Sequence, residues 1–290
     1  MTACSSRADR FYGLSNWRIG LIISENPRFI CFQPWKCGSA TLYQRLRKFD
    51  NNKYPQGKYF NKTLGKITSK HIRLCDFYKL PESHLNYIRF TFVRNPYDRL
   101  YSGFLQRRYR LTKRRYRLTK NPSLHLRFNE SKEELSSIER GFSDFARFFL
   151  DVKIDFIKIS KHVYYNNKPA VDYVGFIETF EASFAQICDK IGIDGAGDTS
   201  ANVRYTEMER ETSSSFSTTR YRYIDKFDRD TIRMVNEKLT NDYQPLGYRI
   251  IQPNELDEDG QLIDPNLSPF ADSIMSNSDG CVLTFDRRNG

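Results

Sequence analysis

Short apolar runs alternate along the chain with amphipathic stretches whose apolar residues recur at helical spacing. Each apolar run is bounded by turn residues or by the start of a helical pattern and predicts a buried strand: residues 29–32, 88–93 and 171–177. The amphipathic stretches predict helices over residues 39–49, after Pro96, over residues 178–191 and over residues 230–243. Pro96 suits the first turn of a helix, and Gly192 suits the end of one.

Strands that alternate with helices predict an α/β fold, in which a single domain holds a P-loop-like parallel sheet flanked by helices on both faces. The turns that follow parallel strands gather along one edge of such a sheet, and phosphates bind there. We expect this domain over residues 28–250, between an N-terminal segment (1–27) and an acidic tail (251–290) that is disordered or draped on the surface. The polar stretch 192–219 predicts a mobile loop or lid.

Composition places the chain among globular proteins, since 39% of its 290 residues are hydrophobic. No apolar stretch approaches the roughly 20 residues of a membrane helix, and residues 1–16 lack the apolar segment of a secretory signal. We therefore expect a soluble, cytoplasmic protein, although a Golgi luminal domain separated from an upstream anchor would look the same. The six cysteines match no zinc pattern and favour a reducing compartment.

The formal charge of the chain is +11, but residues 251–290 hold eight acidic and only two basic residues, so the part before the tail carries +17. A body this basic attracts nucleotides, nucleic acid, acidic glycans or anionic lipid, unless the charge serves solubility alone. The heptad RRYRLTK occurs twice, at residues 107–113 and 114–120, and eight of these fourteen residues are basic. It predicts either two more turns of the helix after Pro96 or a basic arm. The heptad pair is a candidate contact for the acceptor substrate, and a solvated helix face is the alternative.

Residues 34–42, directly after the first predicted strand, have the composition of an anion-binding turn. Gly38 permits a tight turn, and Ser39, Ala40 and Thr41 offer free backbone amides at the start of a helix. Lys36 adds a positive charge, and Cys37 lies between the lysine and the glycine. The Walker pattern GxxxxGK[ST] does not occur in the chain, which disfavours triphosphate hydrolysis on that plan.

Residues 93–104 follow the second predicted strand and carry a second candidate phosphate site. Arg94 leaves the end of the strand and can bind a phosphate at two points. Ser102 lies about two turns down the next helix and reaches the same phosphate if the chain curls back at Asn95. Asp98 and Arg99 are expected to pair with neighbours and hold the turn, and an ordinary helix start remains the alternative.

These segments resemble the 5′-phosphosulfate loop and the 3′-phosphate motif of sulfotransferases that use 3′-phosphoadenosine 5′-phosphosulfate (PAPS). The resemblance is strongest to the carbohydrate sulfotransferases of the Golgi type (heparan 2-O-like) and their bacterial relatives. Their loop reads roughly P-K-x-G-S/C-T-S-L, which residues 36–42 match from the lysine onward. Their second motif reads R-[ND]-P-x-x-R-x-x-S, and its fixed positions are filled by Arg94, Asn95, Pro96, Arg99 and Ser102.

Residues 172–180 and 241–248 resemble two later blocks of the same family, Y-D-F-I-G-x-x-E-T and D-x-x-x-F-G-Y, so the resemblance spans about residues 28–249 in the correct order. Two departures fall in the first loop. Trp35 stands where the family has proline, and Ala40 replaces a usual threonine. We expect these changes to weaken binding of the donor rather than to abolish it.

The resemblance implies transfer of a sulfuryl group from PAPS to an acceptor hydroxyl or amine, without a metal. The acceptor is expected to be a carbohydrate, either an anionic or a neutral glycan, and no nucleic acid is expected as a partner. Lys36 would stabilise charge on the oxygen between phosphate and sulfate. The 5′ end of the donor would be bound by Lys36, Cys37, Gly38, Ser39, Ala40 and Thr41, and the 3′-phosphate by Arg94 and Ser102.

A hydroxyl acceptor needs a base, and histidine suits this task because it is largely neutral at pH 7. Relatives carry the base in a short segment before the phosphate-binding arginine. His71 fits that position, with His84 as the second candidate and a structural histidine as the alternative. The chain's other histidines are His125 and His162.

Further assignments depend on position in the chain. Glu178 follows a strand and is expected to cap the next helix or to pair with an arginine. Position alone assigns Arg204, Thr206 and the stretch near Ser217 to a cover over the nucleotide.

Two other classes of function remain open from the sequence. A basic nucleic-acid-binding or polyanion-binding protein without catalysis would use the RRYRLTK copies, whose tyrosines can stack while the basic residues neutralise phosphate. That class leaves both phosphate motifs unexplained. A nucleotide kinase would bind ATP with Mg²⁺, which the missing GK[ST] disfavours.

Overall fold

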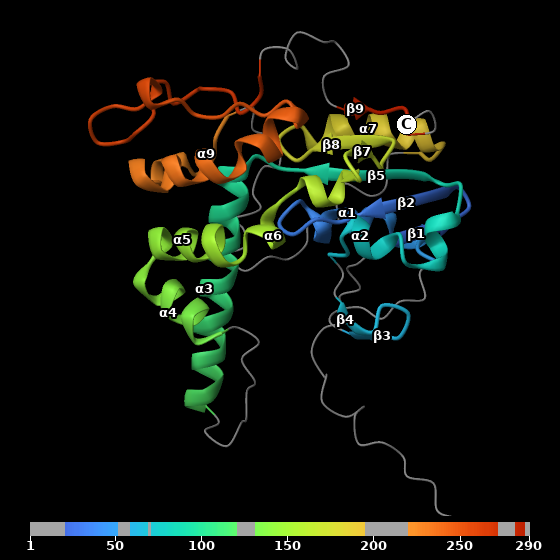
Figure 1. Ribbon diagram of the computed structural model, residues 1–290, viewed down its shortest axis with the longest axis horizontal. Coiled ribbons are helices and arrows are strands. Elements are labelled where there is room, and N and C mark those ends of the chain that lie inside the picture. Colours follow the sequence, from blue (N-terminus) through green and yellow to red (C-terminus); the bar gives the residue numbers. More distant parts are fainter. Residues whose placement is uncertain are drawn as a thin grey trace, which may run out of the picture.

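A five-stranded sheet organises the fold, in the strand order β1–β2–β5–β8–β9 (Figure 1). The computed structural model describes residues 21–51, 59–68, 71–120, 131–194, 220–271 and 282–287. The strands of the sheet are β1 (Ile22–Glu25), β2 (Arg28–Phe32), β5 (Ile88–Val93), β8 (Tyr173–Phe176) and β9 (Val282–Thr284). Two small hairpins stand apart from it: β3 (Tyr59–Asn61) with β4 (Lys66–Thr68), and β6 (Tyr164–Tyr165) with β7 (Lys168–Pro169).

The sheet is mixed rather than purely parallel. Its centre is parallel, because β5 lies between β2 and β8 and runs in the same direction as both. Both edges are antiparallel, since β1 pairs with β2 as a hairpin and β9 pairs with β8. The prediction of a parallel sheet is therefore confirmed for its three central strands and wrong for the edges, where neither strand was predicted.

Helices cover both faces of the sheet, as the alternation of side chains along the strands requires. On one face, the ring of Phe92 in β5 contacts Phe180 of α7 (Phe180–Ile191) at a centroid distance of 5.2 Å. On the other face, Phe32 of β2 contacts Phe77 of α2 (Leu74–Phe77) at 5.0 Å. The sheet is thus buried from both sides, and only the loops at its ends are placed to meet a ligand.

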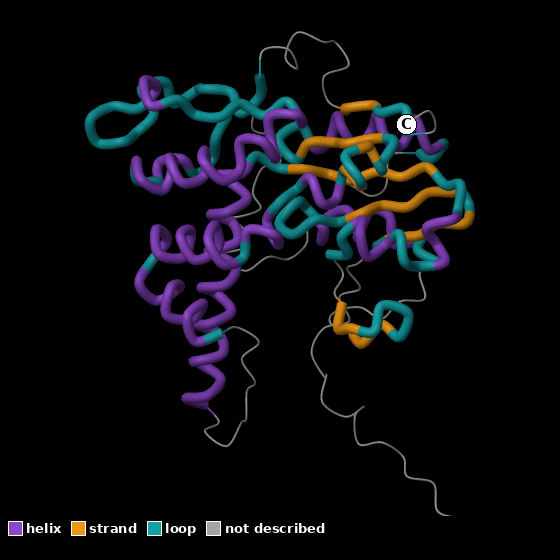
Figure 2. Tube along the Cα trace, in the orientation of Figure 1, coloured by secondary structure: helices purple, strands orange, loops and turns teal. Residues whose placement is uncertain are grey.

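Six further helices complete the described α-helical structure, and most of them lie together beside the sheet (Figures 1 and 2). They are α1 (Ser39–Leu46), α3 (Pro96–Lys120), α4 (Lys132–Arg140), α5 (Phe142–Val152), α6 (Ile154–Ile157) and α9 (Arg229–Tyr243). Short 3₁₀ helices are η1 (Arg47–Phe49), η2 (Pro81–His84), η3 (Ser160–His162), η4 (Ile224–Lys226), η5 (Gln244–Leu246) and η6 (Pro253–Glu255).

The predicted helices are confirmed with small shifts at their ends. Residues 39–49 form α1 and η1, and Gly192 caps α7 with a φ of 71°. Helix α3 runs through both heptads, which together add about four turns rather than the two predicted. In Figure 1 it extends away from the sheet and packs beside α4 and α5. The alternative of a separate arm is wrong for the described residues 107–120.

The stretch after residue 250 is built into the fold where the structure describes it. β9 completes the sheet, and Arg287 forms an ion pair with Asp172 just before β8, with its Nε 3.1 Å from Oδ1. Phe270 stacks on Tyr248 at a centroid distance of 5.6 Å. A disordered tail is therefore wrong for these residues, because they bury apolar and charged groups against β8 and its neighbours. Residues 252–268 are mostly exposed, as expected of a segment draped on the surface.

The described residues do not test the predicted lid in full, and they do not test the predicted domain boundaries. Residues 195–219 of the predicted loop or lid lie outside the described residues. The predicted domain boundaries stay a prediction. No described helix combines the length and the apolar composition that crossing a bilayer requires.

Candidate active site

The turn after β2 (residues 33–38, the Lys36 turn) leads into α1 through two left-handed residues. Lys36 has a φ of 61° and Gly38 a φ of 67°, a conformation that is uncommon for a residue with a side chain. A Cβ on Gly38 would lie 2.7 Å from Cδ1 of Ile177, so a larger residue would be strained at this φ and would require the end of the Ile177 side chain to shift. The backbone therefore turns tightly and presents the first amides of α1, at half-buried residues 39–41, to the edge of the sheet.

The turn after β5 (residues 94–95, the Arg94 turn) leads into α3. Asn95 begins this helix, since its Oδ1 accepts a hydrogen bond from the backbone N–H of Asp98 at 2.9 Å. Asp98 in turn accepts hydrogen bonds from the backbone N–H groups of Arg222 and Tyr223, each at 3.0 Å. Asp98 thus holds the turn by pairing with its neighbours, as the sequence predicts.

Both turns lie at the same edge of the sheet, because each follows the carboxyl end of its strand and the two strands are parallel neighbours. The register pairs Phe32 with Thr91, so the Lys36 turn begins one residue beyond this pair and the Arg94 turn three residues beyond it. Burial raises the pKa of the Cys37 thiol to about 11, and the positive charges of Arg99, Arg94 and Lys36 oppose this rise. Cys37 is therefore within electrostatic reach of basic residues from both turns.

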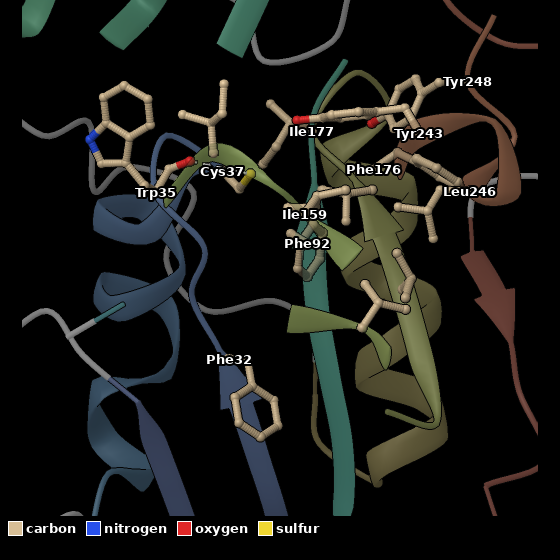
Figure 3. Close-up of a cluster of buried hydrophobic side chains, with 14 of the residues drawn as sticks. Phe32, Trp35, Cys37, Phe92, Ile159, Phe176, Ile177, Tyr243, Leu246 and Tyr248 are labelled. Carbon is tan, nitrogen blue, oxygen red and sulfur yellow. Dashed lines mark hydrogen bonds between the residues drawn. The ribbon is translucent and has the colours of Figure 1, made fainter. Parts of the chain in front are cut away.

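Helix α3 ties the two turns together through Trp35. The Nε of buried Arg99 donates a hydrogen bond to the carbonyl of Trp35 at 2.8 Å, and its Nη1 donates to the hydroxyl of Tyr243 at 2.7 Å. The indole of Trp35 lies against Gly103, where a Cβ would come within 2.0 Å of the ring. Figure 3 shows Trp35 beyond the end of the strand that carries Phe32. The tryptophan that departs from the family pattern is thus matched by a glycine on α3.

Arg94 and Ser102 are both buried, with exposed fractions of 8% and 1%. The guanidinium of Arg94 lies 5.9 Å from the ring centroid of Tyr223, which belongs to the segment that Asp98 holds. Burial raises the pKa of the Tyr223 phenol, and the positive charge of Arg94 opposes this. A buried guanidinium at the start of a helix is a strong site for an anion.

Glu178 connects the ends of β5 and β8 with the chain after α9. Its Oε1 accepts hydrogen bonds from the backbone N–H of Asn95 at 2.7 Å and from Nδ2 of Asn95 at 2.9 Å, and its Oε2 accepts one from the hydroxyl of Tyr248 at 2.9 Å. Burial raises the pKa of Glu178, while the Asn95 bond and Arg94 oppose the rise. Glu178 does not cap the next helix as expected, since the N-cap of α7 is Thr179. Its side chain accepts hydrogen bonds from Asn95 and Tyr248 rather than from an arginine.

His71 reaches the edge of the sheet from the chain between β4 and α2. Its Nδ1 lies 2.6 Å from the carbonyl oxygen of Gln33, the first residue of the Lys36 turn. A carbonyl only accepts, so Nδ1 carries the proton, and in the neutral form of the ring the lone pair lies on Nε2. This is the tautomer that a general base requires, and the ring is half-buried.

The other histidines are placed less favourably or lie outside the described residues. His84 is exposed at the end of η2, before β5 begins, and therefore at the opposite end of that strand from Arg94. His162 is buried, with 2% of its surface exposed. His125 lies outside the described residues, as do Arg204, Thr206 and Ser217. Among the described residues, no group of three or more His, Cys, Asp or Glu side chains could hold a metal ion.

Sequence reasoning missed how Arg99, Tyr223, Tyr243 and Tyr248 are joined to the two turns. Tyr243 and Tyr248 fall within the last block of the resemblance, so a signal existed for these two. The bond from Arg99 to Trp35 links residues 64 positions apart, and no local pattern encodes it.

Comparison with known proteins agrees with this arrangement. The model of the Sulfotransferase family matches residues 20–249, a range that contains both turns, His71 and the blocks around Glu178 and Tyr248. No curated protein and no solved structure matches the chain significantly. Since the family match covers well over half of the sequence, the chain belongs to the sulfotransferase family.

Proposed function

We propose that the protein transfers a sulfuryl group from PAPS to a hydroxyl of a carbohydrate acceptor. The observation that carries this proposal is the meeting of the Lys36 turn and the Arg94 turn at one edge of the sheet. Two positively charged turns after neighbouring parallel strands can bind the two phosphate-bearing ends of one nucleotide. The match to the Sulfotransferase family supports sulfuryl transfer as the reaction.

The Lys36 turn is suited to the 5′-phosphosulfate end. The amides of Ser39, Ala40 and Thr41 and the dipole of α1 favour an anion, and the left-handed backbone at Gly38 lets the anion approach closely. Cys37 is buried in this turn, so its part in binding would come through the backbone. Lys36 would stabilise the negative charge that grows on the bridging oxygen as the sulfuryl group leaves.

The Arg94 turn is suited to the 3′-phosphate. Arg94 is buried at the start of α3, so a phosphate that it binds would be largely shielded from water and bound more strongly than at the surface. Ser102 lies on the buried side of the same helix and would add a hydroxyl. A 3′-phosphate is what distinguishes PAPS from ATP, so these two residues would set the choice of nucleotide.

His71 is the proposed base. The carbonyl of Gln33 holds the proton on Nδ1, so Nε2 can take the proton of the acceptor hydroxyl as the oxygen attacks sulfur. The new O–S bond forms while the bond from sulfur to the bridging oxygen breaks. The products are the sulfated acceptor and adenosine 3′,5′-bisphosphate.

The test uses radiolabelled PAPS and a panel of polysaccharides, with label in the polymer and release of adenosine 3′,5′-bisphosphate as readouts. Loss of the imidazole in His71→Ala should lower the rate of transfer by about 10²–10⁴-fold, the usual contribution of a general base. Binding of the bisphosphate should be unchanged, because His71 is not assigned to the nucleotide.

The matched control is His84→Ala, which removes an exposed histidine from the opposite end of β5 and should leave transfer unchanged. Full activity in His71→Ala would reject His71 as the base. A wild-type protein that binds the bisphosphate but transfers label to no acceptor would argue against the proposed reaction.

A further inference from the structure

The two copies of the heptad RRYRLTK share a side-chain contact as well as a sequence. In the first copy, Nζ of Lys113 lies 5.5 Å from the ring centroid of Tyr109. In the second copy, Nζ of Lys120 lies 5.8 Å from the ring centroid of Tyr116. Seven residues are almost two helical turns, so both lysine–tyrosine pairs face nearly the same direction.

Four basic residues form a stripe along the outer side of α3, which we call the basic stripe: Arg110, Lys113, Arg117 and Lys120. Their spacing of three, four and three residues places them on one side of the helix. Arg110, Lys113 and Lys120 are exposed and Arg117 is half-buried, whereas Leu111 is buried toward the helical bundle. The stripe therefore faces solvent along the part of α3 that extends away from the sheet.

Two of the three acidic residues of α4 pair with other arginines of α3. Glu134 forms an ion pair with Arg107, and Glu139 forms one with Arg115. Neither arginine belongs to the basic stripe. These two ion pairs lie on the side of α3 that faces α4, and the stripe lies on a different side of the helix.

Helix α3 connects the basic stripe rigidly to the proposed donor site. Arg99 and Gly103 contact Trp35 of the Lys36 turn, and the guanidinium of Arg107 lies 6.0 Å from the centroid of the Trp35 ring. With a rise of about 1.5 Å per residue, Lys120 lies about 36 Å along the helix from Pro96. A long polymer bound on the stripe would therefore be held at a fixed position relative to the site.

We propose that the basic stripe binds a linear acidic polysaccharide and that this polymer is the acceptor, an inference that rests on the proposed function. Equivalent charges of the two copies recur about 10 Å apart along the helix. This spacing is comparable with the length of a disaccharide. Within each copy, the arginine and the lysine of the stripe lie about 4.5 Å apart along the helix, so the pair can meet one acidic group on every second sugar.

The tyrosines of the two copies fit the same partner. Tyr116 has 61% of its surface exposed, which is unusual for so large an apolar side chain. Tyr109 is half-buried one copy earlier on the same side of the helix. An exposed aromatic ring beside each lysine offers an apolar surface to the face of a sugar, while the lysine meets its acidic group.

The test compares binding of chemically desulfated chondroitin, as a tetrasaccharide and as a dodecasaccharide, at physiological salt. The stripe variant carries Lys113→Gln, Arg117→Gln and Lys120→Gln, which keep good helix formers in α3. The control variant carries Lys48→Gln, Lys168→Gln and Lys190→Gln, three exposed lysines on other elements, and has the same net charge. Circular dichroism and thermal unfolding establish that both variants fold.

The dodecasaccharide should bind the wild type about tenfold more tightly than it binds the stripe variant, since each exposed charge contributes a factor of about two. The control variant should stay within twofold of the wild type, and the tetrasaccharide should bind all three proteins weakly. Equal losses in the two variants would overturn the proposal. The proposal would also be overturned if single-stranded DNA of equal charge bound as tightly as the dodecasaccharide and lost as much affinity in the stripe variant.

Stabilisation by adenosine 3′,5′-bisphosphate, measured on the same three proteins, separates the two proposals. If all three proteins show an equal thermal shift but chondroitin binding does not depend on the stripe, the stripe is rejected as the acceptor-binding site and the proposed function is retained. Absence of any shift in the wild type would reject the proposed function, and with it the stripe as the site of an acceptor.

Discussion

His71 and His162 differ in exposure, and this difference separates a candidate base from a structural residue. His71 is half-buried at the edge of the sheet, with Nδ1 bonded to the carbonyl of Gln33. His162 is buried, and its burial, with a smaller contribution from the charge of Arg99, lowers its pKa to about 3. His162 is thus neutral at pH 7 but has no access to an acceptor, so a suitable charge state alone does not make a base.

The lowered pKa of His162 predicts a loss of stability in acid. The unfolded chain takes up a proton near the ordinary pKa of about 6.5, whereas the folded chain does so only near pH 3. The contribution of His162 to stability is therefore complete above pH 6.5 and falls as the pH decreases toward 3. Below pH 6 the wild type should lose roughly 1 kcal/mol more per pH unit than His162→Asn. Urea unfolding at pH 7, 6 and 5 measures this, and parallel curves for the two proteins would contradict it.

At the scale of elements, α3 supports the candidate site through packing as well as through charge. Gly103 gives the indole of Trp35 room against the helix, and the same ring stacks on Phe149 of α5 at a centroid distance of 5.7 Å. Trp35 is therefore held between two helices while its carbonyl accepts the bond from Arg99. The Lys36 turn takes its position from this contact.

Gly103→Ala should destabilise the protein even though alanine is the better helix former. The added Cβ would lie 2.0 Å from the Trp35 ring, and the ring is too tightly packed to move away. Overpacking costs about 1–3 kcal/mol or more, against a gain of up to about 1 kcal/mol in helix propensity. With Trp35→Leu already present, the same substitution should be neutral or stabilising. A double-mutant cycle in urea checks this, and an equal effect in both backgrounds would show that Trp35 does not make glycine necessary.

At the scale of the whole molecule, local patterns predict the central strands, four helices and the two turns. Each of these depends on nearby residues, such as Gly38 before α1 or Gly192 after α7. Signals for α5 were also present, since Phe145, Phe149 and their apolar neighbours recur at helical spacing. The mixed edges were not predictable in this way, because β9 joins β8 across more than 100 residues and only the folded chain brings them together.

The same division applies to the candidate site. Lys36, Arg94 and His71 are visible as residue types in a recognisable order. The partners that hold them are not visible, because Glu178 meets Asn95 and Arg99 meets Trp35 only through the arrangement of the sheet and α3. Sequence therefore predicts which residues carry the chemistry, while the structure gives the contacts that position them.

The central claim is that the Lys36 and Arg94 turns together bind one nucleotide with phosphates at both ends. Thermal unfolding with adenosine 3′,5′-bisphosphate, 5′-AMP and ATP–Mg²⁺ tests it most directly. The bisphosphate at 100 times its dissociation constant should stabilise the wild type by about 2.7 kcal/mol. The other two nucleotides should have a smaller effect, and Arg94→Gln should remove the preference. Equal stabilisation by all three nucleotides, or none by the bisphosphate, would contradict the account.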